Sequence, residues 1–341
     1  MSFSLSPDEI RTAEKHVSDI LSLAMEHSAS VPALVVFDSR SELARTLTAV
    51  YRRCLPVAQF IDFDQGTTRT IFAAFDTMPP SGLVVLIQSD SFRLDEFRIR
   101  VELFKRLLKV IEHPHLGRMK DEEVLYYIES LAYDPAYYRG TGRALKDRLD
   151  RAHLCVVDSG GAELVFDSPF EASKLNIGDY TGMNNVGGQF PIGEVFTEAQ
   201  NLEAVNGRVR LFAFGDTSFA VNKPEKPVTL EVTRGRVSRV TDTTEALEQV
   251  LANIRSDEGE VWVRELGFGL NPAFTQDRIV RDIGTYERMC GIHLSLGAKH
   301  GLYKKPEFKN RTTKHHVDVF AVTETVTLDD QVVYKNGAWQ V

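Results

Sequence analysis

The chain has 341 residues and a formal net charge of −8, with 43% hydrophobic and 26% charged residues. This length is typical of roughly two domains, and this composition is typical of a globular protein with a sizeable core. The acidic balance argues against binding to nucleic acid or to an anionic membrane surface, because both prefer a basic protein face. Three cysteines without CxxC spacing indicate neither a disulfide framework nor a zinc ribbon.

No targeting or membrane segment is expected from the sequence. The chain contains no run of about 18 apolar residues that would cross a membrane as a helix. Its N-terminus, MSFSLSPDEIRTAEKH, lacks the basic start and the apolar core of a secretory signal. Together with the unpaired cysteines, these features favour a reduced, cytoplasmic protein.

The first half of the chain alternates between predicted strands and predicted helices. Ser6, followed by Pro7 and two acidic residues, predicts the start of a first helix. Apolar runs predict strands at 33–38, 82–88 and 153–159, and helical spacing predicts helices at 41–54, 95–112, 121–133 and 142–152. Strands separated by helices imply a mostly parallel, Rossmann-like sheet. No GxGxxG fingerprint follows these strands, so no dinucleotide cofactor is expected.

The composition changes at about residue 160 to Gly-rich turns and short alternating strands. Strands are predicted at 207–215, 228–240 and 317–330, with one helix at 243–257. Asn-Gly pairs at 206–207 and 336–337 predict hairpin turns. The sequence therefore predicts an α/β fold: a Rossmann-like domain over 1–165, followed by an antiparallel β-rich (α+β) domain over 166–341. The acidic residues and histidines described next are the reason to expect that this second domain binds metal and is catalytic.

Four segments of the second half place acidic residues and histidines in conformationally stiff surroundings. They are GEVFTE with Glu194 and Glu198, RELGFGLNP with Glu265, GIHLSLG with His293, and KHHVDVF with His316 and Asp318. His-x-Asp on a strand places both side chains on one face, because side chains alternate with a period of two. Imidazole and carboxylate together suit zinc, manganese or iron. The whole set could hold two divalent ions with open positions for water and substrate.

Each of these residues also has an ordinary structural explanation. A single strand histidine is usually satisfied in the core or lies on the surface. Glu265 could be a strand-end charge before turn glycines, and Glu194 could cap a helix formed by 195–205, with Glu198 on its solvated face. The occurrence of all four segments in one half of the chain favours the metal centre. The Gly-Pro-Gly bend before Glu194 would then hold that carboxylate at a fixed point.

In their order and separation, PIGEVFTE, ELGFGLNP, GIHLSLG and HHVD resemble the aminopeptidase T and aminopeptidase S family of dinuclear metallopeptidases. The similarity covers roughly residues 160–320. It implies an enzyme that cleaves a peptide or amide bond with metal-activated water, with Glu194, Glu198 or Glu265 as the general base. It also implies two divalent ions (zinc, cobalt or manganese), a small-molecule or short-peptide substrate and a homodimer. The implied metal ligands are Glu194, Glu265, His293, His316 and Asp318.

One departure from that family keeps two other interpretations open. The family typically has a catalytic Tyr seven residues after the strand His, where this sequence has His300, with Tyr303 nearby; both are candidate catalytic residues. A non-catalytic, peptide-binding relative is therefore one alternative. The other is a mononuclear iron(II) ring-cleaving dioxygenase, or another tailoring enzyme, because the 2,5-dihydroxypyridine dioxygenases resemble the chain in the Gly-rich turn and the closing His-x-Asp. That group has a His where Glu265 stands, which favours the hydrolase without deciding the question, because ferrous sites accept other carboxylates.

Overall fold

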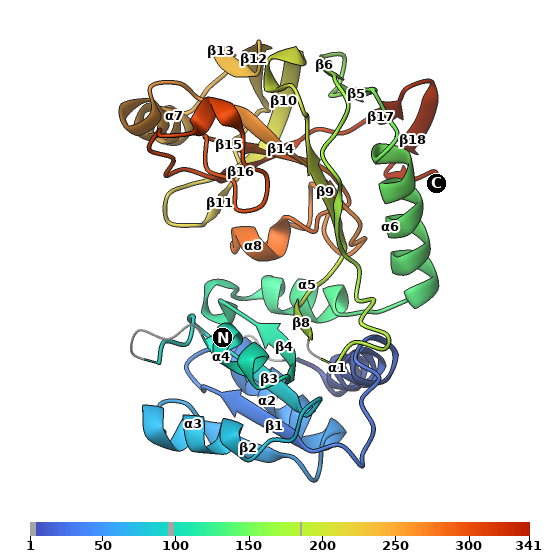
Figure 1. Ribbon diagram of the computed structural model, residues 1–341, viewed down its shortest axis with the longest axis vertical. Helices are drawn as coiled ribbons and strands as arrows, with labels where there is room; N and C mark the ends of the chain where they lie inside the picture. The colour runs from blue at the N-terminus through green and yellow to red at the C-terminus, as the bar shows by residue number, and fades with distance from the viewer. Residues whose placement is uncertain (1–4, 95–98, 185) are drawn as a thin grey trace. The chain divides into compact units, whose positions relative to one another are not determined.

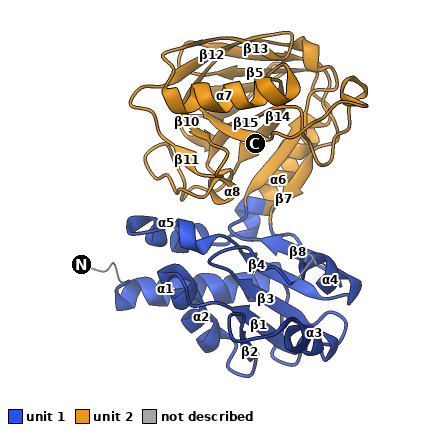
Figure 2. Cartoon of the chain, turned by 90° about the vertical axis from the view of Figure 1, so that its left-hand side faces the viewer, with its two compact units in different colours: residues 1–138, 178–192 blue, residues 139–177, 193–341 orange. Residues whose placement is uncertain are grey.

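The computed structural model describes residues 5–94, 99–184 and 186–341 (Figure 1). The chain divides into two compact units (Figure 2): Met1–Tyr138 with Gly178–Ile192, and Arg139–Ile177 with Gly193–Val341. It therefore passes between the units three times. The boundary expected after residue 165 rests on composition rather than on compactness, and it stays a prediction. Within the described ranges, no helix is both long enough and apolar enough to cross a membrane.

Unit 1 contains a five-stranded parallel sheet in the order β2-β1-β3-β4-β8. Its strands are β1 (Ala33–Phe37), β2 (Gln59–Asp62), β3 (Leu83–Ile87), β4 (Lys109–His113) and β8 (Val186–Gln189). All five residues of β3 are buried, as expected for a parallel strand that is covered on both faces. A parallel sheet is therefore confirmed, and it contains the strands predicted at 33–38 and 82–88, whereas its Rossmann-like detail stays a prediction. The strand predicted at 153–159 forms as β5 (Leu154–Asp158), but its placement in this sheet is wrong, because it pairs antiparallel in the sheet of unit 2. An apolar run predicts a strand but not its partners.

Helices surround this sheet. α1 begins with a capping box, in which the Ser6 hydroxyl accepts from the Glu9 N–H and the Glu9 carboxylate accepts from the Ser6 N–H. One prediction is partly wrong: in the predicted helix 95–112, residues 95–98 lie outside the described residues and 109–113 form β4. A short apolar run does not distinguish strand from helix, and pairing with β3 decides it. The helices are α1 (Pro7–Asp19), a π-helix (Ile20–Ala24), α2 (Glu42–Cys54), α3 (Thr68–Asp76), α4 (Ile99–Lys105), a 3-10 helix (Leu116–Arg118) and α5 (Glu122–Ser130).

The strands of unit 2 form a curled, 14-stranded antiparallel sheet, which confirms the predicted β-rich second half. Its main path is β19-β18-β17-β5-β6-β10-β16-β15-β14-β9-β7; off this path, β11 and β12 pair with β10, and β13 pairs with β12. The strands are β5 (Leu154–Asp158), β6 (Glu163–Asp167), β7 (Lys174–Asn176), β9 (Glu194–Glu198), β10 (Val205–Gly215), β11 (Val221–Asn222), β12 (Val228–Thr233), β13 (Arg236–Thr241), β14 (Val263–Gly269), β15 (Gly291–Leu296), β16 (Val317–Ala321), β17 (Thr325–Leu328), β18 (Gln331–Lys335) and β19 (Ala338–Trp339).

Three longer helical elements and two 3-10 turns accompany the second sheet. α6 spans the first passage between the units and was predicted only from residue 142, and α7 matches the predicted helix at 243–257. The elements are α6 (Pro135–Leu149), a 3-10 turn (Leu202–Ala204), α7 (Glu245–Glu258), α8 (Ile283–Tyr286) and a 3-10 turn (Pro306–Phe308).

The two Asn-Gly pairs have different fates. Asn336 and Gly337 join β18 to β19 with φ of +53° and +76°, so this predicted hairpin turn is confirmed. The turn predicted at 206–207 is wrong, because both residues lie inside β10. A Cβ at Gly207 would lie 2.2 Å from the carbonyl oxygen of Glu163, so this glycine permits close strand pairing.

Candidate metal centre

Four adjacent strands of unit 2 carry the predicted ligands. Glu194 opens β9, Glu265 lies on β14, His293 on β15 and Asp318 on β16, and these strands are neighbours in the order β16-β15-β14-β9. His316 lies two residues before Asp318. The alternative helix at 195–205 does not form, because Glu194–Glu198 pairs as a strand with β14. Antiparallel pairing therefore brings together residues that are far apart in the sequence.

The glycines around Glu265 have a different role from the one expected. The segment ELGFG is not a turn but lies within β14, and every residue of this strand is buried. A Cβ on Gly267 would lie 2.1 Å from the imidazole of His293 on the neighbouring strand. The absence of a side chain at Gly267 is therefore what admits the His293 ring between the strands.

The five predicted ligands form two groups that share one carboxylate. Glu194, Glu265 and His293 make the first group, and Glu265, His316 and Asp318 make the second; in each, one ligand atom per residue lies within 4.8 Å of the others. His293 Nε2 is 3.3 Å from Glu194 Oε1 and 3.5 Å from Glu265 Oε1. His316 Nε2 is 3.2 Å from Asp318 Oδ1. Ligands about 2.1 Å from one ion lie roughly 3.0–3.4 Å apart, so these spacings suit a metal.

Unsatisfied polar atoms support the same interpretation. Both ring nitrogens of His293 and Oδ1 of Asp318 are buried and have no hydrogen-bond partner among the residues that the structure describes. Their contacts with nearby carboxylate or imidazole atoms have suitable distances but lack hydrogen-bond geometry. Burying polar atoms in this way is costly unless something else binds them. The residues therefore fit a divalent cation, although their roles as ligands stay predictions.

His316 is also oriented for metal binding. Its Nδ1 donates a hydrogen bond to the carbonyl oxygen of Lys299 at 3.2 Å. In the neutral ring the proton is therefore on Nδ1, and the lone pair of Nε2 points toward the carboxylates. A backbone carbonyl commonly fixes a metal-binding histidine in this way.

Without metal, the cluster holds protons where a cation would bind. Burial lowers the pKa of His293, but Glu194 and Glu265 outweigh it and raise that pKa to about 10. Burial likewise lowers the pKa of His316, and Asp318 and Glu265 raise it to about 9. Burial raises the pKa of Glu265, yet His293 and His300 hold it well below its usual range. A metal ion must therefore displace protons when it binds.

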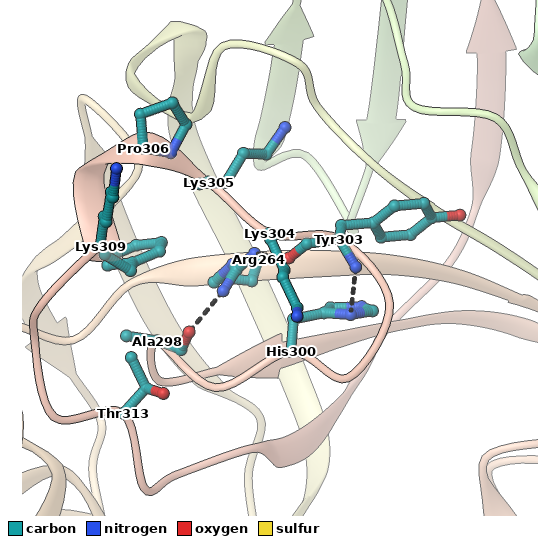
Figure 3. Close-up of a pocket in the computed structure, with 10 residues that line it drawn as sticks. Arg264, Ala298, His300, Tyr303, Lys304, Lys305, Pro306, Lys309 and Thr313 are labelled. Atoms are coloured by element: carbon teal, nitrogen blue, oxygen red, sulfur yellow. Dashed lines mark hydrogen bonds between the residues drawn. The ribbon is translucent and has the colours of Figure 1, made fainter.

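His300 lies next to the centre but in neither ligand group. Its Nδ1 accepts hydrogen bonds from the backbone N–H groups of Leu302 at 3.2 Å and Tyr303 at 3.3 Å (Figure 3). The ring proton is therefore on Nε2, which donates to Glu265 Oε2 at 2.9 Å. His300 thus orients one oxygen of the shared carboxylate.

Two predicted catalytic residues, Glu198 and Tyr303, use their polar groups in hydrogen bonds to other parts of the protein. Glu198 is fully buried and accepts from Arg264 Nε at 3.0 Å and from Nη2 at 2.8 Å. The Tyr303 hydroxyl donates to the carbonyl oxygen of Ala172 at 2.8 Å. Neither residue belongs to a ligand group. Their catalytic roles stay predictions, and the contacts that hold them come from distant parts of the sequence.

A basic pocket lies beside His300 (Figure 3). It has a volume of about 540 Å³, with the buried Arg264 and the exposed Lys304 and Lys309 on its lining. Phe308 supplies an apolar wall against the Arg264 guanidinium, 4.7 Å from the ring centre. The pocket adds a region of positive charge next to the acidic centre of a chain that is acidic overall.

Arg288 is a residue of the centre that the sequence did not indicate. It follows α8, its side chain is 5% exposed, and its Nη1 is 3.3 Å from Glu194 Oε2. A single arginine in a turn has no spacing pattern that distinguishes it from a surface residue. Only the fold shows that it contacts a predicted ligand.

Residues 143–341, the part of the chain that carries the whole centre, match the 2,5-dihydroxypyridine 5,6-dioxygenase family, NicX. The chain belongs to this family. All five predicted ligands, together with His300 and Arg288, lie inside the matched region. Family membership favours the dioxygenase alternative over the hydrolase interpretation.

Two solved structures are similar in fold to this chain. A 2,5-dihydroxypyridine dioxygenase from Pseudomonas putida KT2440 is 14% identical, with a TM-score of 0.63 and 98% of each chain covered. Wild-type AmpT from Thermus thermophilus is 15% identical, with a TM-score of 0.59 and coverage of 97% of this chain and 99% of that one. At these identities the likeness shows the fold alone. No curated protein matches the chain in sequence.

Proposed function

We propose that the protein is a metal-dependent dioxygenase that opens the ring of a hydroxylated aromatic or N-heteroaromatic substrate, using one iron(II) ion. The observation that carries this proposal is the Glu265–His316–Asp318 group, which lies within the region that matches the dioxygenase family. Ferrous oxygenases typically hold iron with two imidazoles and one carboxylate. The group here has the same total number of nitrogen and oxygen ligands around one point, with Glu265 in place of one imidazole.

The residues around this group have distinct tasks in the proposed enzyme. Bound iron(II) would supply the electrons for dioxygen activation and a positive charge for a substrate oxygen. Glu265, His316 and Asp318 bind the ion, and the Lys299 carbonyl fixes the ring of His316. His300 fixes the Glu265 carboxylate.

His293 and Glu194 supply acid–base chemistry in the proposed enzyme. His293 and Glu194 are not needed to bind a single ion, and their Nε2 and Oε1 atoms are 3.3 Å apart. In this arrangement the pair accepts the proton of a substrate hydroxyl and returns it to the product. Neither ring nitrogen of His293 has a hydrogen-bond partner in the described ranges, so no other hydrogen bond competes with proton exchange between this ring and a substrate.

The test is anaerobic loading with iron(II), followed by elemental analysis and measurement of oxygen uptake with 2,5-dihydroxypyridine and related hydroxylated rings. We expect one iron per chain and substrate-dependent oxygen uptake. The variant Asp318→Asn should lose both, and Asp330→Asn, at an exposed position outside the centre, should lose neither. Absence of oxygen uptake with every ring in an iron-loaded protein would overturn the proposal.

A second candidate is an aminopeptidase-like hydrolase with two divalent ions. It is favoured by the Glu194–Glu265–His293 group, which shares Glu265 with the first group as a bridging carboxylate would. The shared fold with AmpT is consistent with it. In such an enzyme, water activated by the ions attacks an amide carbonyl. Two zinc, cobalt or manganese ions per chain, together with release of the N-terminal residue of a short peptide, would establish it in place of the dioxygenase.

A further inference from the structure

Arg288 contacts the Glu194 carboxylate of one ligand group. Its Nη1 lies 3.3 Å from Glu194 Oε2, while the other oxygen of Glu194 faces His293. The Arg288 Nε is buried without a hydrogen-bond partner in the described part of the chain. Arg288 also contacts Glu287, whose side chain is 21% exposed. A guanidinium therefore lies within the centre and next to one potential cation position.

The two ligand groups consequently differ in charge. In the Glu265–His316–Asp318 group, the ion pairs that the two carboxylates make with described residues are all with histidines. In the Glu194–Glu265–His293 group, the charge of Glu194 is paired with Arg288, and Glu265 is shared with the first group. Glu287 screens Arg288 only in part, because a partly exposed ion pair is weakened by solvent.

We infer that Arg288 excludes a second metal ion, so that the centre holds one ion at Glu265–His316–Asp318 and leaves Glu194 and His293 as an acid–base pair. This inference rests on the proposed function, because it explains why a centre with two ligand groups would bind only the one ion that the proposed dioxygenase needs. A guanidinium and a dication about 5 Å apart repel strongly at an effective dielectric constant of about 20. Even with the opposing charge of Glu287, this repulsion lowers the binding affinity for the second ion by about a hundredfold or more.

The experiment titrates metal-free protein with Mn²⁺, using equilibrium dialysis for stoichiometry and electron paramagnetic resonance for spin coupling between ions. The wild type should bind one Mn²⁺ tightly and a second at least about a hundredfold more weakly, without spin coupling. Arg288→Met removes the charge and keeps the length of the side chain. It should bind the second Mn²⁺ about a hundredfold more tightly and show a spin-coupled pair. Arg288→Lys is the matched control, because it keeps the charge and should behave as the wild type.

The outcomes separate this inference from the proposed function. If Arg288→Met still binds a single Mn²⁺, the inference is overturned while the dioxygenase proposal stands. If the wild type itself binds two coupled ions, the inference fails together with the one-ion centre. If the wild type binds one ion but no ring supports oxygen uptake, the dioxygenase proposal fails and the inference stands.

A second variant covers the case in which Arg288→Met does not fold. Glu194→Gln removes the carboxylate that Arg288 contacts, and the inference expects the affinity of the first ion to change by less than about threefold. A loss of about a hundredfold would show that Glu194 binds that ion and would overturn the inference. Thermal unfolding of each variant in the absence of metal checks that the fold is kept.

Discussion

Two buried histidines, one in each unit, have opposite surroundings. His113 ends β4 of unit 1 and His293 lies on β15 of unit 2, and both are fully buried. The Tyr127 hydroxyl donates to the Phe190 carbonyl at 3.0 Å, so it accepts from His113 Nδ1 at 2.9 Å. His113 Nε2 then accepts from the Tyr51 hydroxyl at 2.8 Å. His293 has carboxylates nearby, and neither of its ring nitrogens has a hydrogen bond to any residue in the described ranges.

The protonation of the two rings follows their partners. Burial lowers the pKa of His113 to about 3, and the neutral ring is fully satisfied by two tyrosines. At His293 burial acts in the same direction, but Glu194 and Glu265 raise the pKa to about 10. Burial alone therefore does not show whether a histidine belongs to a core or to a functional site; the polar groups around its ring do.

The largest expected effect is at the metal centre. Asp318→Asn keeps the size of the side chain and removes a charge. We expect metal affinity to fall by more than about a hundredfold, because mutating a residue that only supports a ligand already lowers affinity by about 10–100-fold. Competition with a chelating dye measures this affinity. The stability of unit 1 should not change, and a full complement of metal in the variant would contradict the assignment.

The next largest effect is on stability and concerns His113, the histidine of unit 1. His113→Phe leaves the buried hydroxyl of Tyr51 without its partner, and we expect a loss of about 2–4 kcal/mol of unfolding free energy. Urea unfolding measures it, and elemental analysis of the same samples should find an unchanged metal content. If metal content fell while stability held, His113 would have to be counted with the functional site.

The pH dependence of stability should reflect His113 in particular. Its pKa is about 3 in the folded protein and ordinarily about 6.5. Between these two pH values the unfolded chain binds a proton at this histidine, and the folded protein does not. Its contribution to stability is therefore full above pH 6.5 and falls with acidification, by about 2 kcal/mol between pH 7 and pH 5. Urea unfolding at both pH values should show a smaller decrease for His113→Phe than for the wild type. Equal decreases would contradict this account.

The smallest expected effect is at His300, which combines both kinds of surroundings. Its Nδ1 is satisfied by backbone N–H groups, and its Nε2 donates to a carboxylate. His300→Phe removes the donor to Glu265 and should lower metal affinity by about tenfold. His300→Gln, which can still donate, should recover most of that loss. Equal losses in both variants would point to packing rather than to the hydrogen bond.

Part of the fold and site could be predicted because the signals are local. Alternation of apolar runs with helical periodicity is sufficient to predict β1 and β3 and the parallel arrangement of the first sheet, and four short segments are sufficient to name the five residues that converge. Strand β8 has the sequence VGGQ, which has little strand preference, and it forms because it pairs with β4. The partners of Glu198 and the position of Arg288 likewise depend on contacts between distant segments, which one sequence does not show.

The position of β8 in the chain has a consequence for synthesis on the ribosome. This strand completes the edge of the unit 1 sheet, pairing Lys109–Glu112 of β4 with Val186–Gln189. Until these late residues emerge, at about 5–20 residues per second, the growing chain carries β4 with an unpaired edge. Residues 139–177, which belong to unit 2, emerge during that interval. An open strand edge is a template for pairing with other chains, so the nascent protein can aggregate through β4 during this period.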